Sequence, residues 1–526
     1  MTSDDLFAGR STDFSARYMA LVRLHERLKA HSEPMDSRVA VDIKKLLLKR
    51  AYDHQRQGFF LYREAAETLT TCVVRAGERK IVREALGTLI EVLGTTSGEV
   101  HRAVAGALGA LPLKIKGPDI EVPPTDRLPA VHIDDALRQA GMQNRERGFD
   151  TVGRSLIFGP RADGLVLVFK MARSGDTPPT LQRESIWLEL LHFRKSAFGR
   201  RFAIPKPVKI GNAFVFRLHG VPASRLPTEQ ELHPKGYAIC FWADNTYFGY
   251  PNETCPGRRL GSRRFREVMF RNARILGRMA AMGILHDALI PLFHNRTQRG
   301  RRDDRGAYQW VRAGRLDRWL HSCAYPNIGV SGVRDFEHLL ASDGKNGHFY
   351  LTIGQHFLSL LLVAGSYFRN KDTNLVGLDA DGRPVDARGL FEKTVLEKII
   401  TGLFRNYYKG FVGRRFQGAV PLDPKRLSNR MIEEMGVDRH MEELVRVADQ
   451  QTMTTAEFRS FLIDRGVAEE RVGTYEKDRA DIVINSGPHL GAFNAAISVP
   501  ELIEAAGSMA AMCVAGKFWH ARYGDS

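Results

Sequence analysis

A proline-rich stretch from Lys116 to Pro129 constrains the fold of this chain more than any other feature. Its letters, KGPDIEVPPTDRLP, hold four prolines and a glycine, which interrupt both helices and strands. Before this stretch apolar residues recur at helical spacing, and after it they form short runs around a glycine-containing turn. The sequence therefore predicts a helical domain over residues 1–115, a linker over 116–130 and a different kind of domain beyond.

The N-terminal helical region contains a weak internal repeat. The stretch VREALGTL, from Val82 to Leu89, returns as VAGALGAL, from Val104 to Leu111, 22 residues later. Such repeats of small and apolar residues are typical of stacked helical pairs of the HEAT type. A plain helical bundle with alanine and glycine contacts would show similar letters, so both arrangements stay open.

Strand signals dominate residues 131–222. Two runs, SLIFGP over 155–160 and LVLVFKMA over 165–172, predict a β-hairpin around a turn at Arg161–Gly164. A helix is predicted over 180–198 after an Asp-Thr-Pro-Pro start signal, and a second hairpin from KPVKIGN and AFVFRLHG.

Beyond Pro222 the pattern becomes mostly helical. Helices are expected over 264–282, 348–368, 390–408, 424–435 and 499–514, with a loop over 487–495. We predict an α+β fold, mostly helical. Its later parts are a helical domain over 223–410, which includes a basic insertion over 296–328, and a helical extension over 411–526.

The net charge of +17 is concentrated in two groups of arginines. Such a field attracts polyanions, and arginine favours forked contacts to phosphate or carboxylate. The expected partners are nucleotides, acidic proteins, phosphorylated small molecules or nucleic acid, and a solvated basic surface is the alternative. The groups are Arg258, Arg259, Arg263, Arg264, Arg266 and Arg271, and Arg296, Arg299, Arg301, Arg302, Arg305, Arg312, Arg315 and Arg318.

The spacing of the cysteines and the length of the apolar runs indicate in which cellular compartment the protein is located. The five cysteines never form a Cys-x-x-Cys pair, which argues against a disulfide framework and a zinc ribbon. The start, MTSDDLFAGRSTDF, does not resemble a signal peptide, and the longest apolar stretch is far shorter than the roughly 20 residues of a membrane helix. We expect a cytoplasmic protein without membrane partners.

Lys170 ends the apolar run LVLVFK and needs a partner there. Glu184, fourteen residues later, and Glu189, nineteen residues later, both lie on the predicted helix that follows, and we favour Glu184. The alternative is that Lys170 only extends its ammonium group to solvent from a strand end.

Two motifs follow Lys170 in the chain, and their order is informative about function. GILHDALIPLFHN, from Gly283 to Asn295, joins a His-Asp pair to an asparagine, and GVRDFEHL then presents Asp335. Over about residues 150 to 410 this order resembles the protein-kinase-like superfamily. The resemblance implies a two-lobed fold, with an N-lobe over 131–222 and ATP and Mg²⁺ held between Lys170 and Asp335.

The resemblance also assigns roles. Lys170 would touch the α- and β-phosphates, while Asp287, beside His286, would orient the acceptor or take its proton. Asn295 and Asp335 would ligate Mg²⁺.

The chain departs from the family pattern at the His-Asp pair. No arginine stands between His286 and Asp287. Asn295 follows Asp287 by eight residues, where ordinary kinases have five. His294 is an alternative to Asp287 as the residue that orients the acceptor or takes its proton.

A second departure concerns the phosphates. No Gly-x-Gly-x-x-Gly occurs, so Arg154 and Arg161 are expected to cover them, and Glu337 replaces the glycine of Asp-Phe-Gly. These features predict an atypical member that transfers phosphate or AMP to a protein or small molecule. The alternatives are a catalytically inactive kinase-like scaffold that binds acidic partners and a basic nucleic-acid-binding protein.

Overall fold

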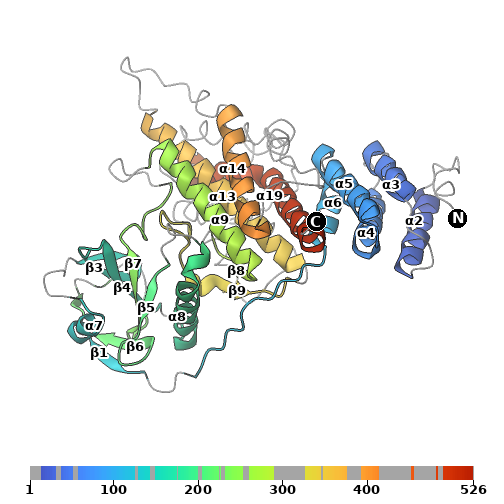
Figure 1. Cartoon of the computed structure of the whole chain (residues 1–526). Helices are drawn as coiled ribbons and strands as arrows, with labels where there is room; N and C mark the ends of the chain where they lie inside the picture. The colour runs from blue at the N-terminus through green and yellow to red at the C-terminus, as the bar shows by residue number, and fades with distance from the viewer. Residues whose placement is uncertain are drawn as a thin grey trace, which may run out of the picture.

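A computed structural model describes the larger part of the chain, and within it the protein is α+β and mostly helical, as predicted. A curled sheet lies on one side and helices lie on the other (Figure 1). The described residues are 14–30, 37–50, 57–96, 98–124, 128–142, 149–173, 176–198, 204–223, 226, 232–252, 260–289, 326–344, 347–375, 393–413, 452–454, 481–483 and 490–524.

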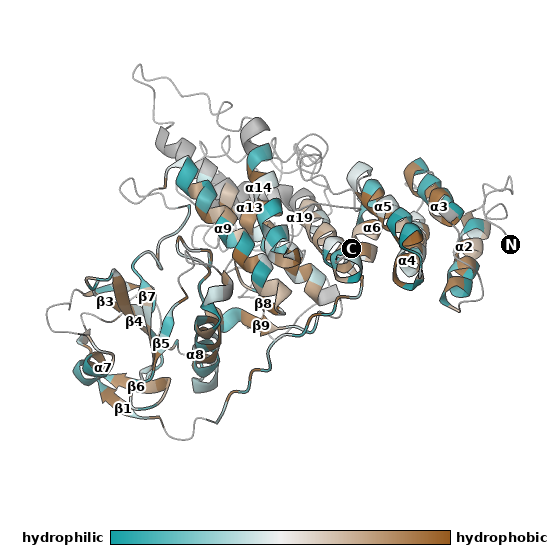
Figure 2. Cartoon of the chain, in the orientation of Figure 1, coloured by the Kyte–Doolittle hydropathy of each residue, from teal (hydrophilic) through white to brown (hydrophobic). Residues whose placement is uncertain are grey.

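The first helices pack in two rows. They are α2 (Phe14–Lys29), α3 (Ser37–Lys49), α4 (Gly58–Arg75), α5 (Arg79–Thr95) and α6 (Gly98–Gly109). In one row α4 packs against both α2 and α6, and in the other α3 packs against α5. Each helix has an apolar side, visible as brown stripes between teal ones (Figure 2). Burial of these sides, at roughly 25 cal/mol per Å², supplies more stability than helix propensity does.

Residues 112–124, which overlap the predicted linker from residue 116 onward, form neither helix nor strand. They run from α6 past two short paired strands, β8 (Ile284–His286) and β9 (Leu339–Ala341). The Gly117 N–H donates to the Ser342 carbonyl at 2.8 Å. A Cβ atom on Gly117 would lie 2.6 Å from the Gly283 carbonyl oxygen, so this approach requires glycine.

A seven-stranded sheet follows the linker. Its strand order is β1-β6-β7-β4-β3-β2, with β5 also paired to β7, and the only parallel pair among them is β1–β6. The helix α7 (Ile133–Gln139) packs at β1, and α8 (Pro178–Phe193) packs across β5 and β7. The strands are β1 (Ala130–His132), β2 (Phe149–Val152), β3 (Ser155–Phe158), β4 (Leu165–Met171), β5 (Lys206–Val208), β6 (Val215–His219) and β7 (Tyr237–Asp244).

The first predicted hairpin is confirmed, and of the second only the turn is present. Strands β3 and β4 pair around the expected turn, with Ser155 opposite Lys170. Strands β5 and β6 exist but both pair with β7, and only a bridge between Ile210 and Ala213 joins them directly. Strand β7 lies beyond Pro222, where the pattern predicts mostly helix. Its run Ala238–Ala243 is wholly buried, so it lacks the alternation that marks a half-exposed strand.

Long helices complete the fold: α9 (Ser262–Ala281), α13 (Gly347–Leu375), α14 (Lys393–Val412) and α19 (Leu490–Tyr523). The first three coincide with predicted helices. The loop predicted over 487–495 is wrong from Leu490 onward, because α19 begins there and runs through the helix predicted over 499–514. Between α14 and α19, two short strands pair antiparallel, β10 (Thr452–Thr454) and β11 (Asp481–Val483). The helix predicted over 424–435 and the basic insertion up to residue 325 lie outside the described residues.

Helix α19 connects the two helical parts. It packs against α13 and α14 on one side and α6 on the other. His101 Nε2 of α6 lies 2.5 Å from Ser508 Oγ, and the Arg522 guanidinium donates to the carbonyls of Val73 and Ala76 at the end of α4. Among the described helices, none is long and apolar enough to cross a membrane.

Candidate functional site

Lys170 lies in the middle of the sheet, on β4 between β3 and β7, and is only 5% exposed. Its ammonium nitrogen donates to Glu184 Oε1 at 2.8 Å and to Asp335 Oδ1 at 3.0 Å. Burial alone would lower the pKa of Lys170, but Asp335, Glu184 and Glu337 raise it above its usual value. A side chain predicted to need one carboxylate partner therefore has several.

Glu184 reaches Lys170 because α8 turns one face to the sheet. Two prolines open this helix, at positions where their missing N–H costs little, and Trp187 and Leu188 are buried on the same side as Glu184. Burial raises the pKa of Glu184 to about 6, against the opposing effect of Lys170. Glu189 lies on the exposed face of α8, so the structure brings only Glu184 to Lys170.

Asp335 has a left-handed backbone, with a φ of 52°. This conformation costs a residue other than glycine on the order of 1–3 kcal/mol and tends to occur at functional positions. A 3₁₀ turn, η5 (Phe336–His338), begins directly after it, with the Phe336 ring fully buried. Burial would raise the pKa of Asp335, but Lys170 overcomes this and lowers it below its usual value.

Glu337 links Arg154 to Lys170 within this cluster. The Arg154 Nη2 atom donates to both of its carboxylate oxygens, at 2.8 and 2.7 Å, across 183 residues of sequence. Arg154 also pairs with Asp176, and Glu337 Oε2 lies 3.7 Å from Lys170 Nζ. The arginine predicted to cover phosphates is thus engaged by two carboxylates of the chain itself.

His286 and Asp287 come from β8 and the residue after it. Helix α9 ends at Ala281, so the pair is separated from it by most of β8. Burial, and then His338, lower the pKa of His286 to about 3, so its ring is neutral and its Nε2–H donates to the Arg334 carbonyl at 2.7 Å. The Asp287 N–H donates to the His338 carbonyl at 3.2 Å. The His-Asp pair and the Asp335 turn are therefore held together.

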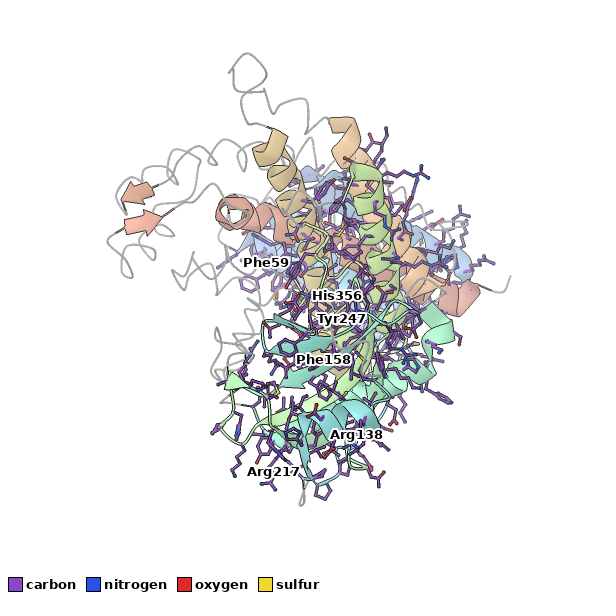
Figure 3. All side chains as sticks on the ribbon, turned by 90° about the vertical axis from the view of Figure 1, so that its left-hand side faces the viewer. Phe59, Arg138, Phe158, Arg217, Tyr247 and His356 are labelled. Atoms are coloured by element: carbon purple, nitrogen blue, oxygen red, sulfur yellow. The ribbon has the colours of Figure 1, made fainter. Side chains whose placement is uncertain are left out.

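Two buried side chains anchor β8 to the helices. His356 of α13 lies with Nε2 at 3.0 Å from the His286 carbonyl oxygen, and its Nδ1 lies 2.8 Å from the Tyr407 hydroxyl of α14. Burial lowers the pKa of His356 to about 4. Figure 3 labels His356 and Tyr247 near the middle of the molecule, and Arg138 and Arg217 at its lower end.

Tyr247 is a residue of the site that sequence reasoning missed. It follows β7, is 5% exposed, and its ring packs against Phe241. Burial, then Glu184 and Asp335, raise the pKa of its hydroxyl well above the usual value. The segment that leads from the sheet to α9 therefore contributes a phenol to the cluster.

Asn327 is a second missed residue. The predicted ligand Asn295, like His294, lies outside the described residues. Asn327 is 3% exposed, and its amide nitrogen donates to the Ala288 carbonyl at 2.7 Å, beside Asp287. It directly precedes the bridge between Ile328 and Val333 that leads to Asp335. The sequence signal that could have identified Asn327 is its position at the start of the short β-like turn that precedes Asp-Phe.

Arg161 is not part of the cluster. It lies in the β3–β4 turn, and the pairing of Ser155 with Lys170 puts that turn at the opposite end of the hairpin from Lys170. Its guanidinium pairs with Asp163 at 3.2 Å and lies 4.7 Å from the centre of the Trp242 ring. Of the two arginines predicted to cover phosphates, the structure therefore brings only Arg154 to Lys170.

The cluster can hold a cation. One ligand atom each from Asp335, Glu337 and His338 lie within 4.8 Å of one another. His25, Glu64 and Glu67 form another such group among the described residues, on α2 and α4. Comparison of the chain with protein-family models and with curated proteins found no match.

Proposed function

We propose that the chain is an atypical protein-kinase-like enzyme that transfers phosphate or AMP from ATP to a protein or small molecule. One observation carries this proposal. Lys170 of a central strand, Glu184 of the helix that follows it and Asp335, 165 residues away, meet within hydrogen-bond distance. Phosphoryl-transfer enzymes of this kind need such a lysine on the phosphates and an aspartate on the metal.

The surroundings of this trio support the same proposal. The elements follow the order strand, strand, helix, strands and then helices. His286 ends β8 and Asp287 follows it; Asn327 precedes a short bridge, and Asp335 follows that bridge before β9 returns to pair with β8. In this proposal the sheet with α7 and α8 is one lobe, and α9, α13 and α14 form the other.

The residues present fit Mg²⁺ and a nucleotide. Magnesium prefers oxygen ligands, and Asp335 offers a carboxylate whose pKa is lowered, so that it stays ionised. The Asn327 amide nitrogen is engaged by Ala288, so its amide oxygen is the atom it can offer a metal. Bound Mg²⁺–ATP would supply the transferable group and offset the charge on it.

Each protein group then has a defined task. Lys170 places a positive charge at the phosphates, and Glu184 keeps its ammonium group oriented. Asp287 orients the acceptor hydroxyl or receives its proton, while His286 holds Asp287 and Asp335 in register through the Arg334 carbonyl.

The N-terminal helices support a second, smaller proposal. Their two rows, and the location of the similar stretches Val82–Leu89 and Val104–Leu111 on α5 and α6, fit stacked helical pairs of the HEAT type. Such a stack would present an extended surface to a protein partner.

Binding and transfer of labelled ATP test the proposed function. Wild type should bind ATP in the presence of Mg²⁺ and transfer label from either the α- or the γ-phosphate, whereas Lys170→Met should lose both activities. Lys209→Met, which removes an exposed lysine directly after β5, is the matched control and should retain both. Label from one position only identifies the reaction.

Two outcomes would favour the alternatives. Binding of ATP without transfer of label would indicate an inactive kinase-like scaffold. No ATP binding, together with affinity for unspecific DNA or RNA that falls steeply with salt, would indicate a nucleic-acid-binding protein. Among the described arginines of the first group, Arg263 and Arg264 pair with Glu267, which reduces the charge they offer to nucleic acid.

A further inference from the structure

Glu337 stands where an external anion would be expected. In the proposed function, Lys170 contacts phosphate, and Arg154 comes from the β2–β3 turn beside it, as shown by the hydrogen bond from the Met171 N–H to the Arg154 carbonyl. The Glu337 carboxylate accepts two hydrogen bonds from Arg154 and lies 3.7 Å from Lys170. Arg154 Nη2 alone makes both contacts, and arginine binds phosphate oxygens through the same guanidinium nitrogens.

The carboxylate is held firmly in this position. Its side chain is 7% exposed, and His338 Nε2 lies 3.3 Å from Oε1. Arg154 Nη2 contacts both of its oxygens, and Lys170 Nζ lies 3.7 Å from Oε2, so two cations of the chain face this one carboxylate. The two cations are therefore already compensated from within the chain.

We propose, resting on the function proposed above, that Glu337 is an internal anion that occupies a phosphate-binding position between Arg154 and Lys170. A polyphosphate ligand must displace it. Displacement breaks the contact between the β2–β3 turn and η5, so binding also frees this turn from the helical part. Glu337 thereby lowers the affinity of the site for phosphates and restricts entry to ligands with several negative charges.

Paired variants distinguish an internal anion from a purely structural ion pair. In Mg²⁺-free buffer, Glu337→Gln should bind inorganic tripolyphosphate about tenfold more tightly than wild type, as expected when a competing state is removed. Arg154→Met should bind it about tenfold more weakly, because a ligand cation is lost. A purely structural ion pair predicts weaker binding for both variants, and that result would overturn the inference.

Hydrogen exchange tests the contact itself. Amides of residues 149–158 should exchange faster in both variants than in wild type, because each variant releases the turn. In wild type, tripolyphosphate should accelerate exchange at residues 336–338 as Glu337 leaves Arg154. This second measurement needs no variant, so it decides the matter even if Glu337→Gln fails to fold. Unchanged or slower exchange there would contradict displacement.

The two proposals fail separately. If ATP binds wild type no more tightly than tripolyphosphate does, the site does not recognise a nucleotide and the proposed function fails, whatever Glu337→Gln does. If ATP binds with preference but Glu337→Gln does not tighten tripolyphosphate binding, the enzyme proposal stands and the role of Glu337 as an internal anion falls.

Discussion

Two buried polar clusters of this protein differ in what they join. The cluster around His25 links neighbouring helices: His25 Nδ1 lies 2.5 Å from Glu64 Oε1, and Nε2 lies 2.8 Å from Thr71 Oγ1. The cluster around Lys170 collects residues separated by as many as 183 positions. The first satisfies one imidazole with two partners on a single helix. The second gathers four carboxylates and two cations in one place, at far greater desolvation cost.

This difference supports our proposal that the Lys170 cluster, and not the His25 cluster, is the site of chemistry. A single buried histidine can be satisfied cheaply and fixes α2 on α4. Several coupled charges with shifted pKa values are costly to assemble, and such groups tend to occur at functional sites. The left-handed backbone of Asp335 adds strain at the same place.

The largest expected effect comes from removing the central cation. Lys170→Met leaves Glu184, Asp335 and Glu337 without that counter-charge, and we expect the free energy of unfolding to fall by about 3–5 kcal/mol. Urea unfolding at pH 7 measures this. The exposed-lysine control, Lys209→Met, should stay within about 0.5 kcal/mol of wild type. A similarly small loss of unfolding free energy for Lys170→Met would contradict the proposed difference between the two clusters.

Lowering the pH should reduce the folding stability around the Lys170 cluster, because two buried histidines near it bind protons more readily in the unfolded chain. His286 and His356 have pKa values of about 3 and about 4, below the ordinary 6.5, so below pH 6.5 the unfolded chain binds protons that the folded chain does not. Folding stability therefore decreases as the pH falls. Glu184 acts in the opposite direction between pH 6 and 4.5, because its raised pKa of about 6 lets the folded state bind a proton first.

The net change between pH 6 and 5 is therefore close to one proton. We expect wild type to lose on the order of 1.4 kcal/mol per pH unit in urea unfolding. Glu184→Gln should steepen this slope, and His356→Gln should flatten it. Parallel curves for all three proteins would show that these groups do not titrate as a buried set.

The smallest effect belongs to the His25 cluster. His25→Gln can keep only one of its two partners, and we expect a loss of about 1–2 kcal/mol in the free energy of unfolding. Label transfer from ATP should be unchanged. Lys29→Gln, which breaks an exposed pair with Glu26, is the control and should cost less than about 0.5 kcal/mol. A parallel fall in label transfer with His25→Gln would mean that the two clusters are coupled.

Local pattern was sufficient to predict the β3–β4 hairpin, α8 and the pairing of Lys170 with a carboxylate fourteen residues later. These features depend on neighbouring residues and on one turn. Strand β7 was missed because it is buried on both faces, and it is the partner that β5 and β6 need, so their pairing was missed too. Arg161 could have been excluded from the hairpin register alone.

The contact between Arg154 and Glu337 could not be predicted from local pattern. It depends on which loops meet after the whole chain has folded, and sequence spacing says nothing about that. Asn327 was overlooked for a related reason: the choice of Asn295 assumed that the ligand follows the His-Asp pair closely. Asn327 lies 39 residues after Ala288 in sequence but contacts it in space.

The position of α19 has a consequence for how the protein is made. During synthesis α6, α13 and α14 leave the ribosome well before α19, whose buried face includes Met509 and Cys513. Until then the apolar surfaces that α19 covers are exposed, and a nascent chain in that state is prone to aggregate or to engage chaperones. Translation that stops before residue 490 should therefore yield insoluble product, although every residue around Lys170 has already been made.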